Sequence, residues 1–69
     1  MINDIIKVWS DDLLSEHGVT CLEDLPEHIV VSEIDEHLGT MQNMLIVRDY
    51  DYLLAHNRFI KMLISLLEE

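Results

Sequence analysis

The chain has 69 residues, 49% of them hydrophobic, and its fourteen acidic and four basic side chains give a formal net charge of −10. A chain of this length forms one domain at most, so we expect residues 1–69 to form a single domain. The negative charge of the chain repels phosphate backbones and anionic lipid, so we expect it to bind neither nucleic acid nor a membrane directly. Cys21 is the lone cysteine, which excludes an internal disulfide, and the absence of a signal-like or membrane-spanning apolar run predicts a cytoplasmic protein.

The N-terminal segment has the periodicity of an amphipathic helix over residues 2–16. Ile2, Ile6, Trp9 and Leu13 are spaced by four, three and four residues, which places them on one stripe of a helix. Gly18 follows where a residue in the left-handed conformation commonly ends a helix. We therefore predict a first helix that buries this stripe and ends just before Gly18.

The next segment combines signals for the start of a helix with a second apolar stripe. Thr20 and Asp24 each precede a glutamate by three residues, which is the spacing of a capping box, and Pro26 is tolerated only in a first turn. These signals predict a short turn at 20–24 and then a second helix over about 25–38. The residues expected to face inward are Ile29 or Val30, Ile34 and Leu38.

Two places could divide the rest of the chain. Gly39 either ends the second helix, with Thr40 capping a third, or lies inside a longer helix at a cost of about 1 kcal/mol. Apolar residues keep helical phase beyond this point, which favours one helix over about 40–67. The alternative is a break at 48–51, with Asp49 or Asp51 as the N-cap. The predicted fold class is all-α, a small bundle of three helices, or four with the additional break.

If the C-terminal segment forms a helix, apolar residues occupy most of its circumference. Such a helix needs cover on two sides. Two short helices of the same chain can cover one side, and we expect a second copy to cover the other in a C2 homodimer, the commonest oligomer. The predicted self-association residues form two adjacent stripes and are Tyr52, His56, Phe59, Ile60, Leu63, Leu66 and Leu67.

The segment between residues 11 and 36 contains nine carboxylates and neither lysine nor arginine. Such a segment attracts a basic protein surface and raises the association rate. The leading hypothesis is a small acidic protein-binding module. It resembles in kind the acidic inhibitors that phages and mobile elements encode, which occupy a basic nucleic-acid-binding site on a protein in the host cytoplasm. The predicted partner contacts are Asp12, Glu27, Glu33, Asp35 and Glu36.

Two other functions stay open at this point. In one, the protein is a structural or assembly subunit that packs its C-terminal helix into a larger complex, and the acidic residues only maintain solubility. In the other, Glu33 and His37 share a metal ion, since they stand four residues apart, although the sequence gives a third ligand no defined place. The chain has no serine elbow and no phosphate-binding loop. We therefore expect no enzyme, and assign no catalytic residue, metal or cofactor.

Overall fold

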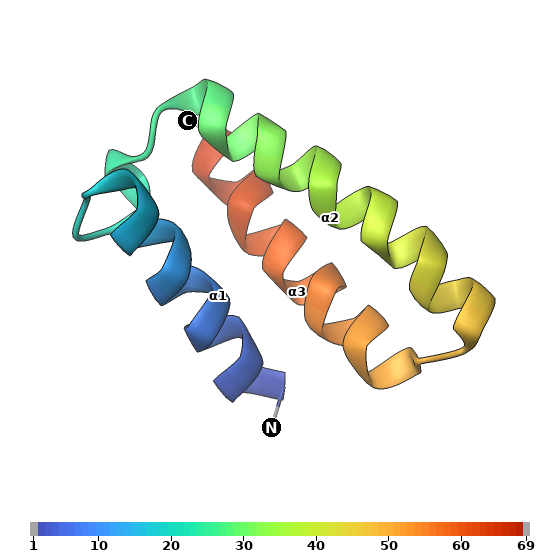
Figure 1. The fold of residues 1–69 in the computed structure, drawn as a ribbon. Coiled ribbons are helices and arrows are strands. Elements are labelled where there is room, and N and C mark those ends of the chain that lie inside the picture. The colour runs from blue at the N-terminus through green and yellow to red at the C-terminus, as the bar shows by residue number, and fades with distance from the viewer. Residues whose placement is uncertain (1, 69) are drawn as a thin grey trace.

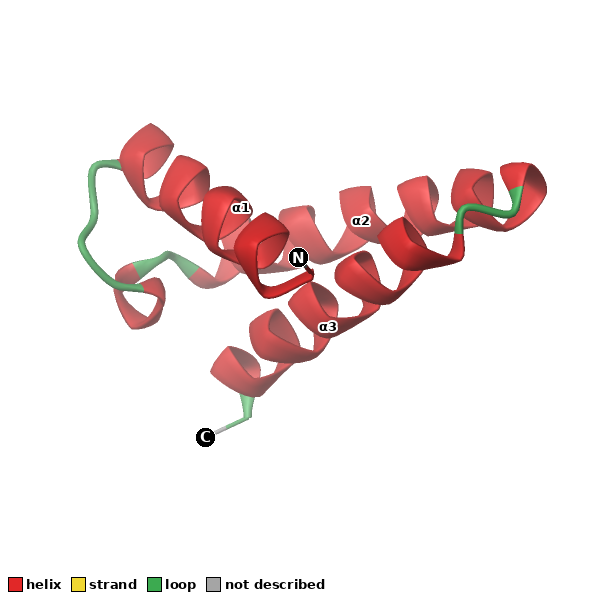
Figure 2. Ribbon diagram, turned by 90° about the horizontal axis from the view of Figure 1, so that it is seen from below, coloured by secondary structure: helices red, strands yellow, loops and turns green. Residues whose placement is uncertain are grey.

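The computed structural model describes residues 2–68, and the fold that it shows is all-α. Figure 1 shows α2 and α3 as an antiparallel hairpin with α1 beside α3, and Figure 2 shows that α1 lies over one side of this hairpin. The molecule measures 34 × 21 × 20 Å. The three-helix bundle predicted from the sequence is confirmed. The elements in chain order are α1 (Ile2–His17), the short 3₁₀ helix η1 (Leu22–Asp24), α2 (Glu27–Val47) and α3 (Tyr50–Leu67).

Helix α1 begins and ends as the sequence predicts. Gly18 has a φ of +66°, in the left-handed region that glycine adopts without steric cost. The amide of Val19 donates to the carbonyl of Leu14 at 3.1 Å, and the amide of Gly18 donates to the carbonyl of Ser15 at 3.3 Å. These two bonds form a Schellman motif, which satisfies carbonyl groups at the end of the helix.

The connector between α1 and α2 is stabilised differently from the prediction. Neither predicted capping box forms at a helix start: η1 has Cys21 as its N-cap, and α2 has Pro26, with no side-chain hydrogen bond at either cap. Asp24 instead accepts a hydrogen bond from the Cys21 thiol at 3.1 Å. The carbonyl of Pro26 accepts the amides of Ile29 and Val30, at 3.0 and 3.2 Å. Pro26 therefore starts α2 through its backbone, one residue before the first turn.

Helix α2 continues through Gly39, so the predicted end near Leu38 is wrong, and so is the predicted helix over 40–67. The chain turns at Arg48, which has a φ of +61°. Asp49 caps α3, because its carboxylate accepts the amide of Tyr52 at 3.4 Å. An unbroken helix over 40–67 would be about 42 Å long, longer than the whole molecule. The turn at Arg48 lets α2 fold back along α3 and cover its apolar face.

The core lies where the three helices meet, and α3 supplies much of it. Phe59 and Leu63 of α3 are fully buried and pack with Leu13 of α1, Leu25 of the connector and Val30 of α2. Val30, rather than Ile29, is thus the fully buried residue of the predicted pair.

Leu38 was expected to face inward and does not. Its side chain is 48% exposed, whereas Ile34 packs against the core. The hairpin directs Val30, Ile34 and His37 towards α3 and α1, and Leu38 lies about 100° further round the helix than His37. The prediction that Leu38 faces inward is therefore wrong. Helix α3 packs against the neighbouring stripe of α2, which does not include Leu38.

Candidate functional site

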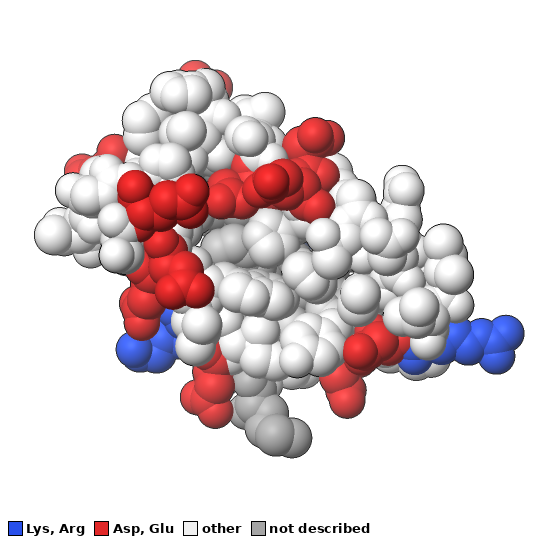
Figure 3. Space-filling view, in the orientation of Figure 1, with Lys and Arg blue, Asp and Glu red and all other residues white. Residues whose placement is uncertain are grey.

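An acidic cleft lies between α1 and α2. Asp12 and Glu16 of α1 line one side and Glu33 of α2 the other, and the cleft encloses about 170 Å³. Trp9 and His37 lie among its lining residues. Figure 3 shows acidic side chains along both sides of the hollow between α1 and α2. Two segments separated in the sequence therefore combine their carboxylates around one depression.

Glu33 lies close to other carboxylates, and its pKa is raised. Burial raises the pKa of the Glu33 carboxyl, and a hydrogen bond with Glu36 and the negative charges of Glu36 and Glu16 raise it further. The charge of His17 acts in the opposite direction and is the weakest of these causes. The ion pair between Lys7 and Asp11, at 3.1 Å, involves exposed side chains on α1 that do not line the cleft. The carboxylates in and beside the cleft thus repel one another.

The five predicted contact residues do not form one continuous site. Asp12 and Glu33 line the acidic cleft, and Glu36 acts on Glu33. Asp35 and Glu36 line a shallow depression that also includes His37 and His56. The sequence analysis omitted Glu16 from the site. Its position four residues after Asp12, one turn further along the same helix face, is the signal that could have found it.

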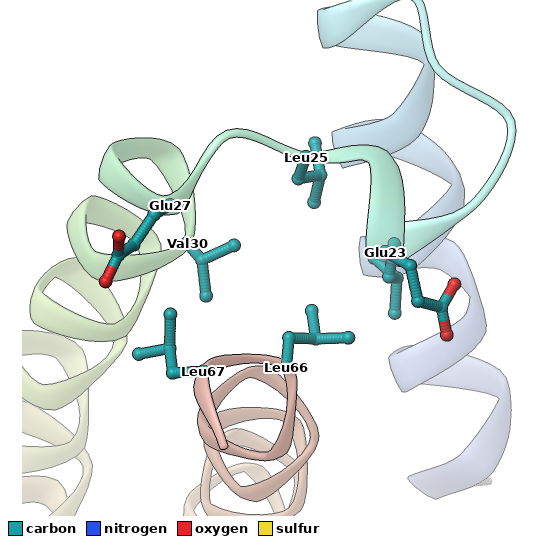
Figure 4. Close-up of a pocket in the computed structure, with 7 residues that line it drawn as sticks. Glu23, Leu25, Glu27, Val30, Leu66 and Leu67 are labelled. Atoms are coloured by element: carbon teal, nitrogen blue, oxygen red, sulfur yellow. The ribbon is translucent and has the colours of Figure 1, made fainter. Parts of the chain in front are cut away.

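Glu27 lies apart from the acidic cleft. It belongs to a pocket of about 250 Å³ between the connector, the start of α2 and the end of α3. In Figure 4, Leu25, Val30, Leu66 and Leu67 surround the opening, whereas the carboxylates of Glu23 and Glu27 turn away from it. Glu27 therefore adds charge to the molecule without adding it to the acidic cleft.

A cluster of rings lies beside the cleft and joins the three helices. The Nδ1 atoms of His37 and His56 are 2.7 Å apart and share a hydrogen bond. Trp9 stacks on His56 with ring centroids 4.4 Å apart, and the edge of Phe59 approaches His37 with centroids 4.9 Å apart. Sequence analysis missed this pair because nineteen positions separate the two histidines. The one available signal was the place of His56 on an apolar stripe.

The histidine pair favours the uncharged form. Burial lowers the pKa of His37, and so does the neighbouring His56, while Glu36 opposes them. Burial also lowers the pKa of His56. A hydrogen bond between two Nδ1 atoms needs one donor and one acceptor, so at least one ring is neutral. The pair acts as a polar bond inside the bundle, tying α2 to α3.

The predicted self-association residues divide into two groups. His56, Phe59, Ile60 and Leu63 are buried within the single chain, and Leu66 packs against its core. Tyr52 and Leu67 are exposed. Helices α1 and α2 together already cover most of the two stripes. Self-association itself stays a prediction, and Tyr52 and Leu67 are the members of the set that lie on the surface.

Cys21 and the candidate metal ligands are the remaining groups that could take part in chemistry. The hydrogen bond from Cys21 to Asp24 and the nearby carboxylates raise the pKa of the thiol, which keeps it protonated at neutral pH. Within residues 2–68, no three side chains of His, Cys, Asp or Glu are placed to hold one metal ion together. Glu33 and His37 both line the acidic cleft, but they gain no third ligand there.

The fold and the cleft define a small all-α protein with an acidic depression between two helices. Compared with protein-family models, curated proteins and solved structures, the chain matches none. None of the helices described for residues 2–68 has the length and apolarity needed to span a membrane.

Proposed function

We propose that the protein is an acidic binding module whose cleft between α1 and α2 receives a basic segment of another protein. The observation that supports this best is Glu33, a partly buried carboxyl that shares the cleft with Asp12 and Glu16 and is crowded by Glu36. A lysine or arginine from a partner would supply the positive charge that these carboxylates lack. Binding of this kind relieves their repulsion and gives the proposal a physical driving force.

The same chemistry suggests the kind of partner. A groove that binds nucleic acid presents arginine and lysine at the spacing of phosphates. Carboxylates on α1 and α2 offer negative charges to such a groove from two sides of one depression. We therefore extend the proposal to inhibition, in which the module occupies the basic site of a nucleic-acid-binding protein. This is the mode of action expected of a phage or mobile-element inhibitor.

The alternative function, insertion of the C-terminal helix into a larger complex, has less support. Phe59, Ile60 and Leu63 of α3 already pack inside the chain's own bundle. Insertion of α3 elsewhere would expose these side chains or require α1 and α2 to separate from it. The acidic cleft needs no such rearrangement.

The test uses a short synthetic peptide of alternating arginine and alanine as the basic probe. Trp9 is the only tryptophan of the chain and lines the cleft, so its fluorescence reports occupancy directly. The double variant Glu33→Lys/Glu36→Lys should weaken peptide binding by at least about tenfold, because attraction is replaced by repulsion. Circular dichroism should show unchanged helicity, and binding should weaken between about 50 and about 300 mM salt, as exposed charges are screened.

The matched control is Glu23→Lys/Glu68→Lys, which changes the net charge equally at two exposed positions outside the cleft. The control should bind the peptide nearly as well as the wild type. Equal weakening in both double variants would show that the peptide responds only to net charge, and the cleft would then lose its assigned role.

A further inference from the structure

The pair formed by His37 and His56 connects the acidic cleft with the shallow depression beside it. His37 is among the residues that line the cleft, and together with His56 it also lines the depression. The Nδ1 atoms of the two rings are 2.7 Å apart. A titratable group is thus built into the wall of the cleft, where its charge acts on whatever the cleft receives.

The hydrogen bond between the rings limits the number of protons that the pair can carry. In the uncharged pair, one Nδ1 donates its hydrogen and the other Nδ1 accepts it. A first proton enters at the Nε2 atom of the donating ring and leaves this bond in place. A second proton would have to occupy the accepting Nδ1, which would bring two N–H groups and two positive charges together. The pair therefore takes up one proton while α2 and α3 keep their contact.

The charges around the pair are mostly negative. Burial and the neighbouring His56 lower the pKa of His37, while the negative charge of Glu36 acts in the opposite direction. Burial also lowers the pKa of His56, so the pair is largely uncharged at neutral pH and gains its proton in acid. From α3, His56 and Phe59 line the two depressions. The charged residues that line them are Asp12 and Glu16 of α1 and Glu33, Asp35 and Glu36 of α2, and His17 of α1 acts on Glu33.

A proton on the pair and a basic side chain in the cleft act on the same carboxylates. Glu33 lines the cleft with His37, and Glu36 acts on both of these residues. In the empty cleft, the negative charges stabilise a proton on the pair. A lysine or arginine in the cleft takes over these carboxylates and repels that proton. Protonation and binding therefore oppose each other, and each weakens the other by the same factor.

We propose that the pair of His37 and His56 makes the acidic cleft pH-dependent, so that the cleft holds a basic segment while the pair is uncharged and releases it when the pair is protonated. The inference rests on the function proposed for the cleft and adds its regulation. A charge within about 4–6 Å shifts the pKa of a titratable group by about 1–3 units. A shift of one unit on binding corresponds to a loss of affinity of about tenfold in acid.

Glu33 also titrates, and the experiment must separate its contribution from that of the pair. The pKa of Glu33 is raised, so it loses its charge at a higher pH than an ordinary glutamate and weakens the binding of a cation in acid. His37→Asn removes the ring that lines the cleft and leaves Glu33 in place. The side-chain amide of asparagine still offers His56 a hydrogen-bond donor and takes up no proton. The difference in pH dependence between wild type and variant therefore measures the effect of the pair.

Isothermal titration calorimetry on the full chain tests the proposal, with the peptide of alternating arginine and alanine as the probe. Between about pH 7.5 and about pH 5.0, the Kd of the wild type should rise about tenfold more than that of His37→Asn. The matched control is His28→Asn, which lies on the same helix at an exposed position outside both depressions. It should keep the pH dependence of the wild type, and circular dichroism should show that all three proteins remain helical over this range.

Nuclear magnetic resonance of the histidine ring protons gives a second measurement that needs no variant. Saturating peptide should lower the pKa of the pair by about one unit, as the linkage between binding and protonation requires. If the peptide binds but the pKa of the pair stays unchanged, or if wild type and His37→Asn show the same pH dependence, the regulation is overturned and the cleft keeps its proposed function. If the peptide binds at no pH in this range, both the regulation and the proposed function are overturned.

Discussion

Replacement of Phe59 by alanine removes a ring that α1, α2 and α3 share. Phe59 is 1% exposed and packs with Leu13, Val30 and Leu63. Its ring centroid lies 5.7 Å from that of Trp9 in α1 and 4.9 Å from that of His37 in α2. The substitution therefore leaves a cavity at the point where the three helices meet, rather than at the edge of the core.

The magnitude follows from the size of that core. A buried Phe→Ala substitution costs about 3–5 kcal/mol, the sum of lost transfer free energy and the cavity that remains. A chain of 69 residues has a free energy of unfolding of about 3.5–10 kcal/mol, from 0.05–0.15 kcal/mol per residue. Phe59→Ala should thus remove about a third of the stability or more. At the lower limit of stability, a cost of about 4 kcal/mol or more leaves the variant largely unfolded at 25 °C.

Urea unfolding followed by circular dichroism measures the effect, with wild type and variants at the same protein concentration. Leu54→Ala is the control, since Leu54 is on the same helix and 47% exposed, and it should cost less than about 1 kcal/mol. A loss below about 1 kcal/mol for Phe59→Ala, with an unchanged dependence on urea, would refute the placement of Phe59 at the centre of the bundle.

Two further predictions concern titration and backbone conformation. The pKa values of His37 and His56 are lower in the folded protein than in the unfolded chain. As the pH falls below about 6.5, the unfolded chain therefore binds protons before the folded protein does. The free energy of unfolding decreases as a result, until the pH reaches the folded pKa values. Urea titrations between about pH 7.5 and 5.5 should show the wild type losing more stability than His56→Phe, and an equal loss would exclude the pair as its source. Gly39→Ala should stabilise by about 0.8–1 kcal/mol, since an added Cβ meets no atom within 4 Å in the middle of α2. Gly18→Ala should destabilise by about 1–2 kcal/mol at its φ of +66°, and thermal melts giving the same sign for both would contradict this account.

Local signals in the sequence were sufficient for the first helix and for the class of fold. The spacing of Ile6, Trp9 and Leu13 and the glycine at position 18 act within a few residues of one another, so their consequences do not depend on the rest of the chain. The capping signals near Thr20 and Asp24 were equally local and nevertheless misleading. Asp24 bonds to the Cys21 thiol instead, because the connector follows the path that buries Leu25.

The candidate site also depends partly on local sequence signals and partly on the tertiary structure. A run of carboxylates without counter-charges is visible in the sequence, and Asp12 and Glu33 were chosen from it. That Glu16 joins them in one cleft, while Glu27 lies near the end of α3, depends on how α1 crosses the hairpin. The pairing of His37 with His56 depends in the same way on the register of α2 against α3.

The sequence by itself therefore determined that this protein is all-α, that its charge is concentrated in one half, and that its last helix is strongly apolar, since composition and periodicity are properties of the chain. Only the tertiary structure decided that the chain turns at Arg48 rather than at Gly39. Both positions tolerate a break locally, and the choice depends on the burial gained when α2 covers α3. The same turn decides which apolar residues α3 buries and which remain exposed, because a helix apolar over most of its circumference does not specify the side on which its neighbours pack.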